Sequence, residues 1–157
     1  MKINKKLLFI CIAIPLLVGI VASALTSDSM EVFAELNKPS FAPPAWLFPV
    51  AWTVLYVLMG ISSYLILTSN APKEEIEEAI RIYGYQLAVN FLWPTFFFNL
   101  GWYLFSFFWL VLLWVLVLRM ILKFKNISKL AAYLNIPYIL WLTFAAILNF
   151  SIWILNG

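Results

Sequence analysis

The stretch VNFLWPTFFFNLGW, residues 89–102, raises the question on which the fold depends. It is apolar enough for a membrane helix, yet it carries two asparagines and one proline among six aromatic rings. A buried asparagine costs free energy unless its amide is hydrogen-bonded, and a proline inside a helix removes a backbone hydrogen bond. The surroundings of this stretch must therefore supply hydrogen-bond partners, or a ligand must use the free groups.

The composition of the whole chain places it among integral membrane proteins. Hydrophobic residues make up 65% of its 157 residues and charged residues only 11%, whereas soluble domains are about half apolar and about a quarter charged. The mean hydropathy of +0.98 makes a lipid bilayer the medium in which the chain folds. At this length we expect a single domain over residues 1–157.

The residue types that are missing exclude several classes of function. The chain has no histidine and one cysteine, Cys11, which excludes intrachain disulfides, Cys/His zinc sites and histidine ligation of haem. We therefore expect no metal site, no resident cofactor and no catalytic set of residues. The net charge of +3 is small, and nothing in the sequence predicts nucleic-acid binding.

Five apolar segments are each close to the roughly 20 residues with which a helix crosses a bilayer. They cover residues 7–25, 46–67, 82–100, 103–122 and 131–155. They lack the alternation of membrane barrel strands, so helices are the remaining way to satisfy the backbone in lipid. We predict an all-α membrane protein, a bundle of five transmembrane helices, in which Gly101 forms most of a tight hairpin between the third and the fourth.

The positions of lysine and arginine predict the orientation of this bundle, because cytoplasmic loops carry an excess of both. Lys38 alone lies on one side. The other side carries Lys2, Lys5, Lys6, Lys73, Arg81, Arg119, Lys123, Lys125 and Lys129. We therefore expect a cytoplasmic N-terminus and a C-terminus outside. The membrane itself is expected to be a bacterial cytoplasmic membrane.

The first segment allows an alternative interpretation as a signal peptide. A basic start, an apolar middle and the sequence Ala-Ser-Ala at 22–24 resemble a cleavable leader. The apolar run is long for a leader, and cleavage would remove one wall of the bundle. Mass spectrometry of the membrane-extracted protein distinguishes the two, because a mature chain that starts at Leu25 contradicts five helices.

Helical spacing brings rings, amides and small side chains to one face on each of three segments. They are Trp52 and Tyr56 on the second segment, Asn90, Trp93 and Phe97 on the third, and Trp141, Ala145 and Asn149 on the fifth. Pro94 and Pro137 would each free a backbone carbonyl and kink their helices. This pattern predicts a ring-lined pocket for a large flat apolar ligand, in the outer half of the membrane.

A purely structural interpretation is equally compatible with the pattern. Asn90 and Asn149 could simply bridge neighbouring helices, as polar residues in membrane helices often do. The tryptophans near the outer interface could belong to an ordinary aromatic belt.

The connection at 26–45 is predicted to lie over the mouth of this pocket. Asp28, Glu31 and Glu35 are spaced for one face of a short surface helix. The sequence KPSFAPP follows at 38–44, and its prolines Pro39, Pro43 and Pro44 stiffen the backbone. A stiff, partly apolar loop in this place would act as a lid.

Three long blocks of sequence resemble the translocator protein family, also called the peripheral-type benzodiazepine receptor family (TspO/MBR), or tryptophan-rich sensory proteins in bacteria. They are KPSFAPPAWLFPVAWTVLYVLMGISSYL, QLAVNFLWPTFFF and PYILWLTFAAILNFSIW. The resemblance covers about residues 10–155. It implies a five-helix bundle, usually a homodimer, whose pocket binds protoporphyrin IX, haem and benzodiazepine-type ligands and is closed by the first loop.

The resemblance also implies which residues line the pocket. They are Trp52, Tyr56, Asn90, Trp93, Phe97, Trp141, Ala145 and Asn149, with Lys38, Pro39, Pro43 and Pro44 in the lid. Lys38 is a speculative partner for the propionates of a porphyrin. The family's functions are given variously as sensing, as transport of tetrapyrroles or lipids, and as light-dependent breakdown of porphyrin, and the sequence leaves these alternatives open.

One part of the chain departs from the animal members of that family. They end the last helix with a proposed cholesterol motif that contains a tyrosine and a basic residue. Phe150 and Ile154 stand at those two places here, so steroid binding through that motif is not expected. The fourth segment, residues 103–122, is apolar all round and is the best candidate for the face that joins two subunits.

Overall fold

A computed structural model describes residues 2–157, and every regular element in that range is a helix. The elements are α1 (Lys5–Leu25), α2 (Ser29–Glu35), α3 (Leu47–Leu67), α4 (Lys73–Pro94), the π-helix η1 (Thr95–Asn99), α5 (Tyr103–Ile127), α6 (Lys129–Tyr133) and α7 (Ile136–Asn156). The prediction of an all-α fold is confirmed.

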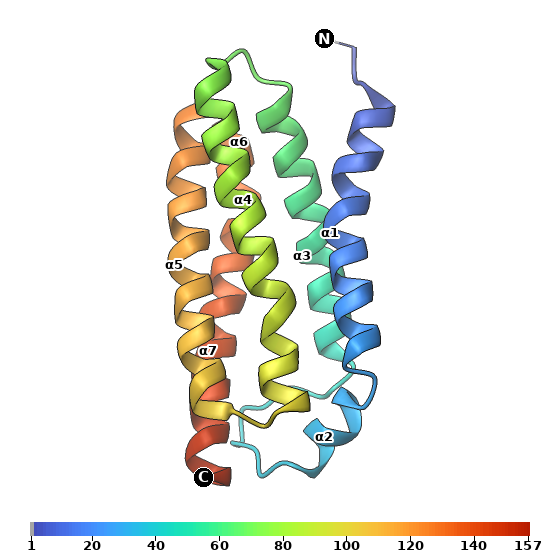
Figure 1. Ribbon diagram of the computed structural model, residues 1–157, viewed down its shortest axis with the longest axis vertical. Coiled ribbons are helices and arrows are strands. Elements are labelled where there is room, and N and C mark those ends of the chain that lie inside the picture. The colour runs from blue at the N-terminus through green and yellow to red at the C-terminus, as the bar shows by residue number, and fades with distance from the viewer. Residues whose placement is uncertain (1) are drawn as a thin grey trace.

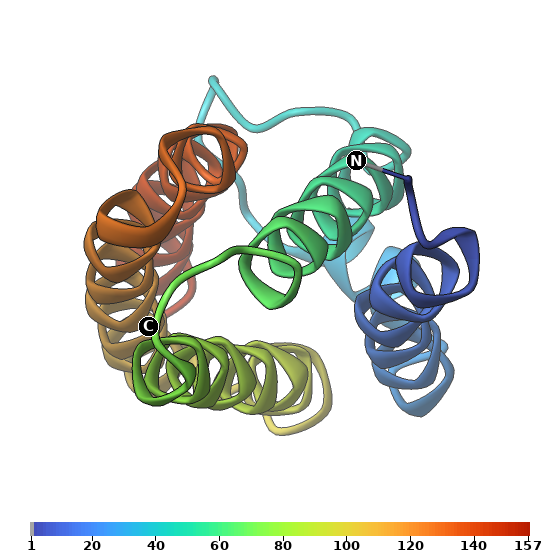
Figure 2. The same ribbon diagram turned by 90° about the horizontal axis from the view of Figure 1, so that it is seen from above.

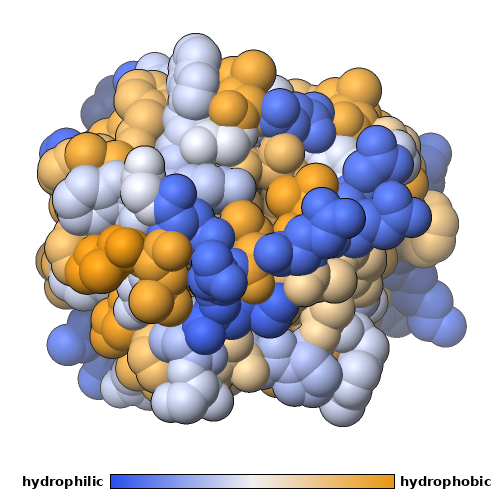
Figure 3. Space-filling model, turned by 90° about the horizontal axis from the view of Figure 1, so that it is seen from below, coloured by the Kyte–Doolittle hydropathy of each residue, from blue (hydrophilic) through white to orange (hydrophobic). Residues whose placement is uncertain are grey.

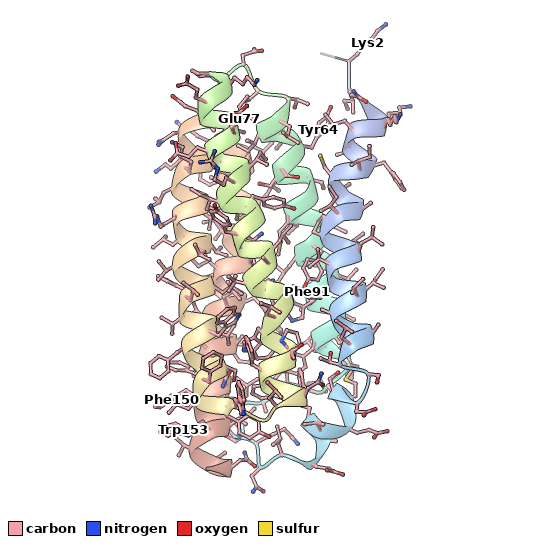
Figure 4. All side chains as sticks on the ribbon, viewed as in Figure 1. Lys2, Tyr64, Glu77, Phe91, Phe150 and Trp153 are labelled. Carbon is pink, nitrogen blue, oxygen red and sulfur yellow. The ribbon has the colours of Figure 1, made fainter. Side chains whose placement is uncertain are left out.

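The long helices run side by side in one bundle (Figure 1). Seen along the bundle, α1 lies against α3 at one side, while α4, α5 and α7 complete the ring (Figure 2). Figure 4 places Lys2, Tyr64 and Glu77 toward one end and Phe150 and Trp153 toward the other. The short helix α2 lies at the second end, which also carries the C-terminus (Figure 1).

Four helical segments of the described chain are long and apolar enough to cross a membrane. They are Lys5–Leu25, Leu47–Leu67, Tyr103–Ile127 and the combined segment Lys129–Asn156. The chain is therefore a multi-pass integral membrane protein. Helix α4 runs beside them, but its first turns carry Lys73, Glu74, Glu75, Glu77 and Glu78, which lowers its overall hydropathy.

Helices α1 and α3 approach each other closely because each has a glycine at the contact. A Cβ atom on Gly60 would lie 2.5 Å from the Cα atom of Ile12 and 2.7 Å from the carbonyl oxygen of Cys11. A Cβ atom on Gly19 would lie 2.4 Å from the ring of Tyr56. Small residues allow such backbone contact in membranes, where van der Waals packing drives helix association.

The fourth predicted helix is longer at its C-terminal, basic end than the sequence indicated. The sequence predicted a helix over 103–122 and a connection from Lys123 onward, but α5 continues to Ile127. The ammonium of Lys123 lies 2.6 Å from the carboxylate of Glu78 in α4. This contact holds the pKa of the Glu78 carboxyl below its usual range, and it keeps the added turns of α5 alongside α4.

The last predicted segment, 131–155, is not one continuous helix. It divides into α6 and α7, with the break at Leu134 and Asn135. The side-chain amide of Asn135 donates to the carbonyl of Ala131 and to the hydroxyl of Ser62, at 3.0 and 2.7 Å. Pro137 therefore lies in the first turn of α7, where the backbone N–H that proline lacks would have no partner within the helix. The predicted kink at Pro137 is wrong.

The stretch at 89–102 ends α4 in an unusual way. Pro94 is the last residue of α4, and the backbone continues directly into the π-helical turn η1. π-helical turns widen a helix by one residue and are frequent at functional sites. Gly101 then takes a φ of +63°, which glycine adopts at little cost, and the predicted tight hairpin between α4 and α5 is confirmed.

Candidate functional site: an aromatic cavity closed by α2

The bundle contains a cavity of about 660 Å³ at the end that carries α2. This volume is within the range of about 300–1,000 Å³ that is typical of small-molecule sites. Its walls come from α1, α3, α4, η1, α5 and α7, and Ser29, Met30 and Phe33 of α2 also line it. The cavity is thus the space that the long helices leave between them next to α2.

All eight residues that the sequence predicted for the pocket line this one cavity. They are Trp52, Tyr56, Asn90, Trp93, Phe97, Trp141, Ala145 and Asn149. The helical spacing of these residues therefore correctly predicted that side chains nearly 100 residues apart in the chain lie around one space. The predicted lid residues Lys38, Pro39, Pro43 and Pro44 do not line it.

The rings form pairs within the cavity walls. Trp52 stacks on Tyr56 with ring centroids 5.6 Å apart, and Trp93 stacks on Phe97 at 5.0 Å. Trp141 meets the edge of Phe48, a residue that the sequence analysis did not select, at 5.9 Å. Such stacked and edge-on pairs stabilise one another by about 0.5–1.5 kcal/mol, and they present flat apolar faces to the space between them.

Asn90 is the centre of a buried hydrogen-bond network between three helices. The hydroxyl of Tyr56 donates to its side-chain oxygen at 2.9 Å, and its amide donates to the hydroxyl of Tyr138 at 2.7 Å. The Tyr138 hydroxyl in turn donates to Gln86 at 2.7 Å. Asn90 therefore bridges α3, α4 and α7, as the structural interpretation proposed, while it also lines the cavity.

Replacing Asn90 by leucine is expected to lower the free energy of unfolding by about 1–2 kcal/mol. The change leaves the buried hydroxyls of Tyr56 and Tyr138 without that partner, although hydrogen bonds inside membranes are often modest. Unfolding in a titration with SDS measures the loss. In a double-mutant cycle, the losses of stability from Asn90→Leu and Tyr138→Phe should not add up, because the two side chains share a hydrogen bond. The losses from Asn90→Leu and Tyr64→Phe should be additive, since Tyr64 lies at the far end of α3. Coupling in the second cycle alone would contradict the network around Asn90.

Asn149 is the centre of a second network. Its side-chain oxygen accepts hydrogen bonds from the indole of Trp93 at 3.2 Å and from the hydroxyl of Ser106 at 3.1 Å. Its amide donates to the carbonyl of Tyr103 at 2.7 Å. Asn149 thus holds α4, α5 and α7 together and fixes the orientation of the Trp93 ring.

Trp141 differs from the other predicted residues because its polar atom is both buried and without a partner. Its indole N–H is buried and makes no hydrogen bond within residues 2–157. Buried donors without partners are rare in folded proteins, because each costs the free energy of its lost hydration. The Trp141 N–H is therefore a buried donor that the described residues leave without a partner.

The loop after α2 is fixed by contacts that the sequence did not reveal. The ammonium of Lys38 donates to the carbonyls of Phe33, Ala34 and Leu36 at 2.8, 3.1 and 3.1 Å. It therefore completes the last turn of α2, and the expected role as a partner for a ligand's acid group is not supported by its position.

A reciprocal pair of hydrogen bonds anchors the same loop to the end of α7. The backbone N–H of Asn37 donates to the side-chain oxygen of Asn156 at 3.0 Å, and the Asn156 amide donates to the Asn37 carbonyl at 2.9 Å. Through this clamp, the loop spans the α2 end of the bundle from α2 to α7 (Figure 1).

The contribution of α1 to the cavity wall was missed in the sequence. Leu16, Gly19, Ile20 and Ser23 of α1 line the cavity at helical spacing, so a signal was present. Because α1 is apolar on every face, this stripe does not stand out by hydropathy. Phe33, the buried residue of α2, also lines the cavity, in the connection that was predicted to lie over the pocket.

Comparison with known proteins gives a consistent result over nearly the whole chain. The model of the TspO/MBR family matches residues 11–154. A relative named tryptophan-rich protein TspO, from Chlorobaculum tepidum, is 36% identical over 98% of this chain and 99% of its own. Protein CrtK of Rhodobacter capsulatus is 40% identical over 79% and 78%, and the translocator protein of Sus scrofa is 36% identical over 89% and 84%.

Proposed function

Because the chain belongs to the TspO/MBR family, we propose that it is a membrane binding or sensory protein for tetrapyrroles, such as protoporphyrin IX, and for related flat apolar ligands. The ligand would lie in the aromatic cavity. The eight lining residues predicted from the sequence would form its binding site, and the clamped loop after α2 would cover it.

The observation that carries this proposal is the direction of the tryptophans. Trp52, Trp93 and Trp141 come from three helices and all line one cavity, whereas Trp46 and Trp102 are 63% and 52% exposed on the outside. A space bounded by flat rings suits a large planar molecule.

The same proposal includes the orientation of the bundle in the membrane. Helix α4 would cross the bilayer together with the four apolar segments, since it runs beside them for its full length (Figure 1). The end with α2 would face outward, because its only lysine or arginine is Lys38, while the other nine lie at the opposite end. The cavity would then open toward the outer leaflet.

Titration with protoporphyrin IX tests the proposal directly, with tryptophan fluorescence as the readout. Binding of the wild-type protein should quench the fluorescence, and the double variant Trp52→Ala, Trp141→Ala should lose about 100-fold or more in affinity. Each truncation removes a large apolar contact area, and contacts of this kind dominate binding energies.

The matched control is the double variant Trp46→Phe, Trp102→Phe, which removes tryptophans outside the cavity. It should bind porphyrin as the wild type does. Equal affinity in the cavity variant and in the wild type would overturn the proposed site, and an absence of quenching in every protein would overturn the proposed ligand.

A further inference from the structure

A second hollow, of about 240 Å³, lies between α4 and α5 toward the end of the bundle opposite α2. It shares no lining residue with the aromatic cavity, so the proposed function does not use it. The residues that line it are Glu78, Ile82, Arg119, Leu122, Lys123 and Asn126. The four from α5 follow the spacing i, i+3, i+4, i+7, which is that of one helix face. The hollow is therefore bordered by one stripe of residues from each helix.

Positive charge prevails around this hollow. The ammonium of Lys123 lies 2.6 Å from the carboxylate of Glu78, and the Lys123 side chain is only 25% exposed, so it is held in place. Exposed Arg119 takes part in neither ion pair of the described chain. The hydrogen bond from Lys123, together with the charges of Lys123, Arg81 and Arg119, holds the pKa of the Glu78 carboxyl below its usual range. One carboxylate thus faces three cations, and the positive charge is not neutralised.

The end of the bundle that carries α2 has no comparable group of cations. Figure 3 looks onto that end and shows hydrophilic side chains between hydrophobic ones. Its one lysine or arginine is Lys38, whose ammonium already donates to three carbonyls near the end of α2. A place for an anion is therefore found at the α4–α5 hollow rather than beside the aromatic cavity.

An exposed apolar stripe continues from the hollow toward the middle of α5. Leu122, which lines the hollow, is 55% exposed, and Val115 and Leu112 are each 43% exposed. Val115 and Leu112 precede Arg119 by four and seven residues, which keeps them on the helix face that carries Arg119. A molecule bound here would meet cations at one end and apolar side chains along its length. This combination suits a phospholipid better than a soluble anion.

From this arrangement we propose that the hollow between α4 and α5 binds an anionic phospholipid. The planar guanidinium of Arg119 pairs with the phosphate through parallel N–H donors. The ammonium of Lys123 has three donors, so it binds the same phosphate while it keeps its contact with Glu78. An acyl chain lies along Val115 and Leu112. Basic pockets between membrane helices bind such headgroups, and the orientation proposed above puts this one in the cytoplasmic leaflet, whose surface is negatively charged.

Native mass spectrometry of the detergent-extracted protein tests this site by counting bound lipids. The probes are phosphatidylglycerol and phosphatidylcholine with identical acyl chains, which differ in net charge. The wild-type protein should bind its first phosphatidylglycerol about fivefold or more tightly than phosphatidylcholine. The double variant Arg119→Gln, Lys123→Gln should lose most of this preference, whereas its affinity for phosphatidylcholine should stay within about twofold of the wild type.

The matched control is Lys5→Gln, Lys6→Gln. It removes two exposed cations at the same end of the bundle, but on α1 and outside the hollow (Figure 1). Its preference for phosphatidylglycerol should equal that of the wild type. Equal preference in the wild type and in the Arg119→Gln, Lys123→Gln variant would overturn the proposed site. An equal loss in the control would do so too, because it would show a general effect of charge.

Glu78→Gln should change the affinity in the opposite direction. Without the carboxylate, the ammonium of Lys123 is released from its ion pair, and the affinity for phosphatidylglycerol should rise about threefold, a gain that added salt reduces by screening. A variant that merely misfolds cannot produce such a gain. An unchanged or lower affinity in a folded Glu78→Gln protein would contradict the proposed role of the charges.

Inorganic phosphate distinguishes a lipid from a soluble anion as the ligand. At a concentration equal to that of the lipid, it should leave bound phosphatidylglycerol in place, because it makes no contact with Val115 and Leu112. Displacement of the lipid at that concentration would overturn the assignment to a phospholipid. Porphyrin titrations report on the aromatic cavity alone, so a failure of the proposed function and a failure of this site are seen separately.

Discussion

An Ala145→Phe variant should lose ligand binding almost completely, by about 100-fold or more, while its fold remains intact. Ala145 lies on the cavity wall contributed by α7, on the same face as Trp141 and Asn149. A phenyl ring in place of its methyl group would occupy the space that a planar ligand needs, and a filled cavity cannot accept the ligand without costly displacement of packed helices. Fluorescence titration with protoporphyrin IX measures the loss.

The matched control for this variant is Ile147→Phe on the same helix. Ile147 is 55% exposed on the outside of α7, where a phenyl ring meets only lipid or detergent. This variant should bind ligand as the wild type does. Retained affinity in Ala145→Phe, in a protein that elutes as a single folded species, would show that the ligand binds elsewhere.

The largest loss of stability is expected for Gly60→Leu. The backbone of α1 lies so close to Gly60 that even a Cβ atom would sit 2.5 Å from the Cα atom of Ile12. Backbone cannot yield as a flexible side chain can, so α1 must move away from α3. We expect a decrease of about 3 kcal/mol in the free energy of unfolding, measured by titration with SDS, together with weaker ligand binding because α1 forms one wall of the cavity.

Gly84→Leu provides the comparison for that variant. No atom lies within 4 Å of a Cβ atom built at Gly84 in α4, and leucine has a higher helix propensity than glycine by roughly 0.8 kcal/mol. This change should therefore leave stability unchanged or raise it slightly. Similar losses in both glycine variants would mean that the close contact between α1 and α3 does not contribute to stability.

The sequence was sufficient to predict the faces of α3, α4 and α7 that meet around the cavity, because polar and aromatic residues at helical spacing stand out against an apolar background. It was not sufficient for the wall from α1, since a helix that is apolar all round shows no distinct face. The close contact at Gly60 could not be predicted either, because its partners Cys11 and Ile12 are far away in the chain.

Several other features could not be predicted because they depend on polar contacts that form only in the fold. The break before α7 depends on Asn135, whose amide reaches Ser62 in α3. The last turns of α5 contain Lys123, which contacts Glu78 of α4. Lys38 was considered a ligand partner because its charge is isolated in the sequence, whereas in the fold the carbonyls at the end of α2 surround its ammonium.

The clamp between Asn37 and Asn156 has a practical consequence for anyone who labels or purifies the protein. A fluorescent protein or affinity tag joined directly after Gly157 would pull on the residue next to the one that holds the loop in place. Ligand affinities measured with such a fusion could report a loosened cover over the cavity rather than the native one. A tag placed before Lys2, at the opposite end of the bundle (Figure 4), avoids this interference.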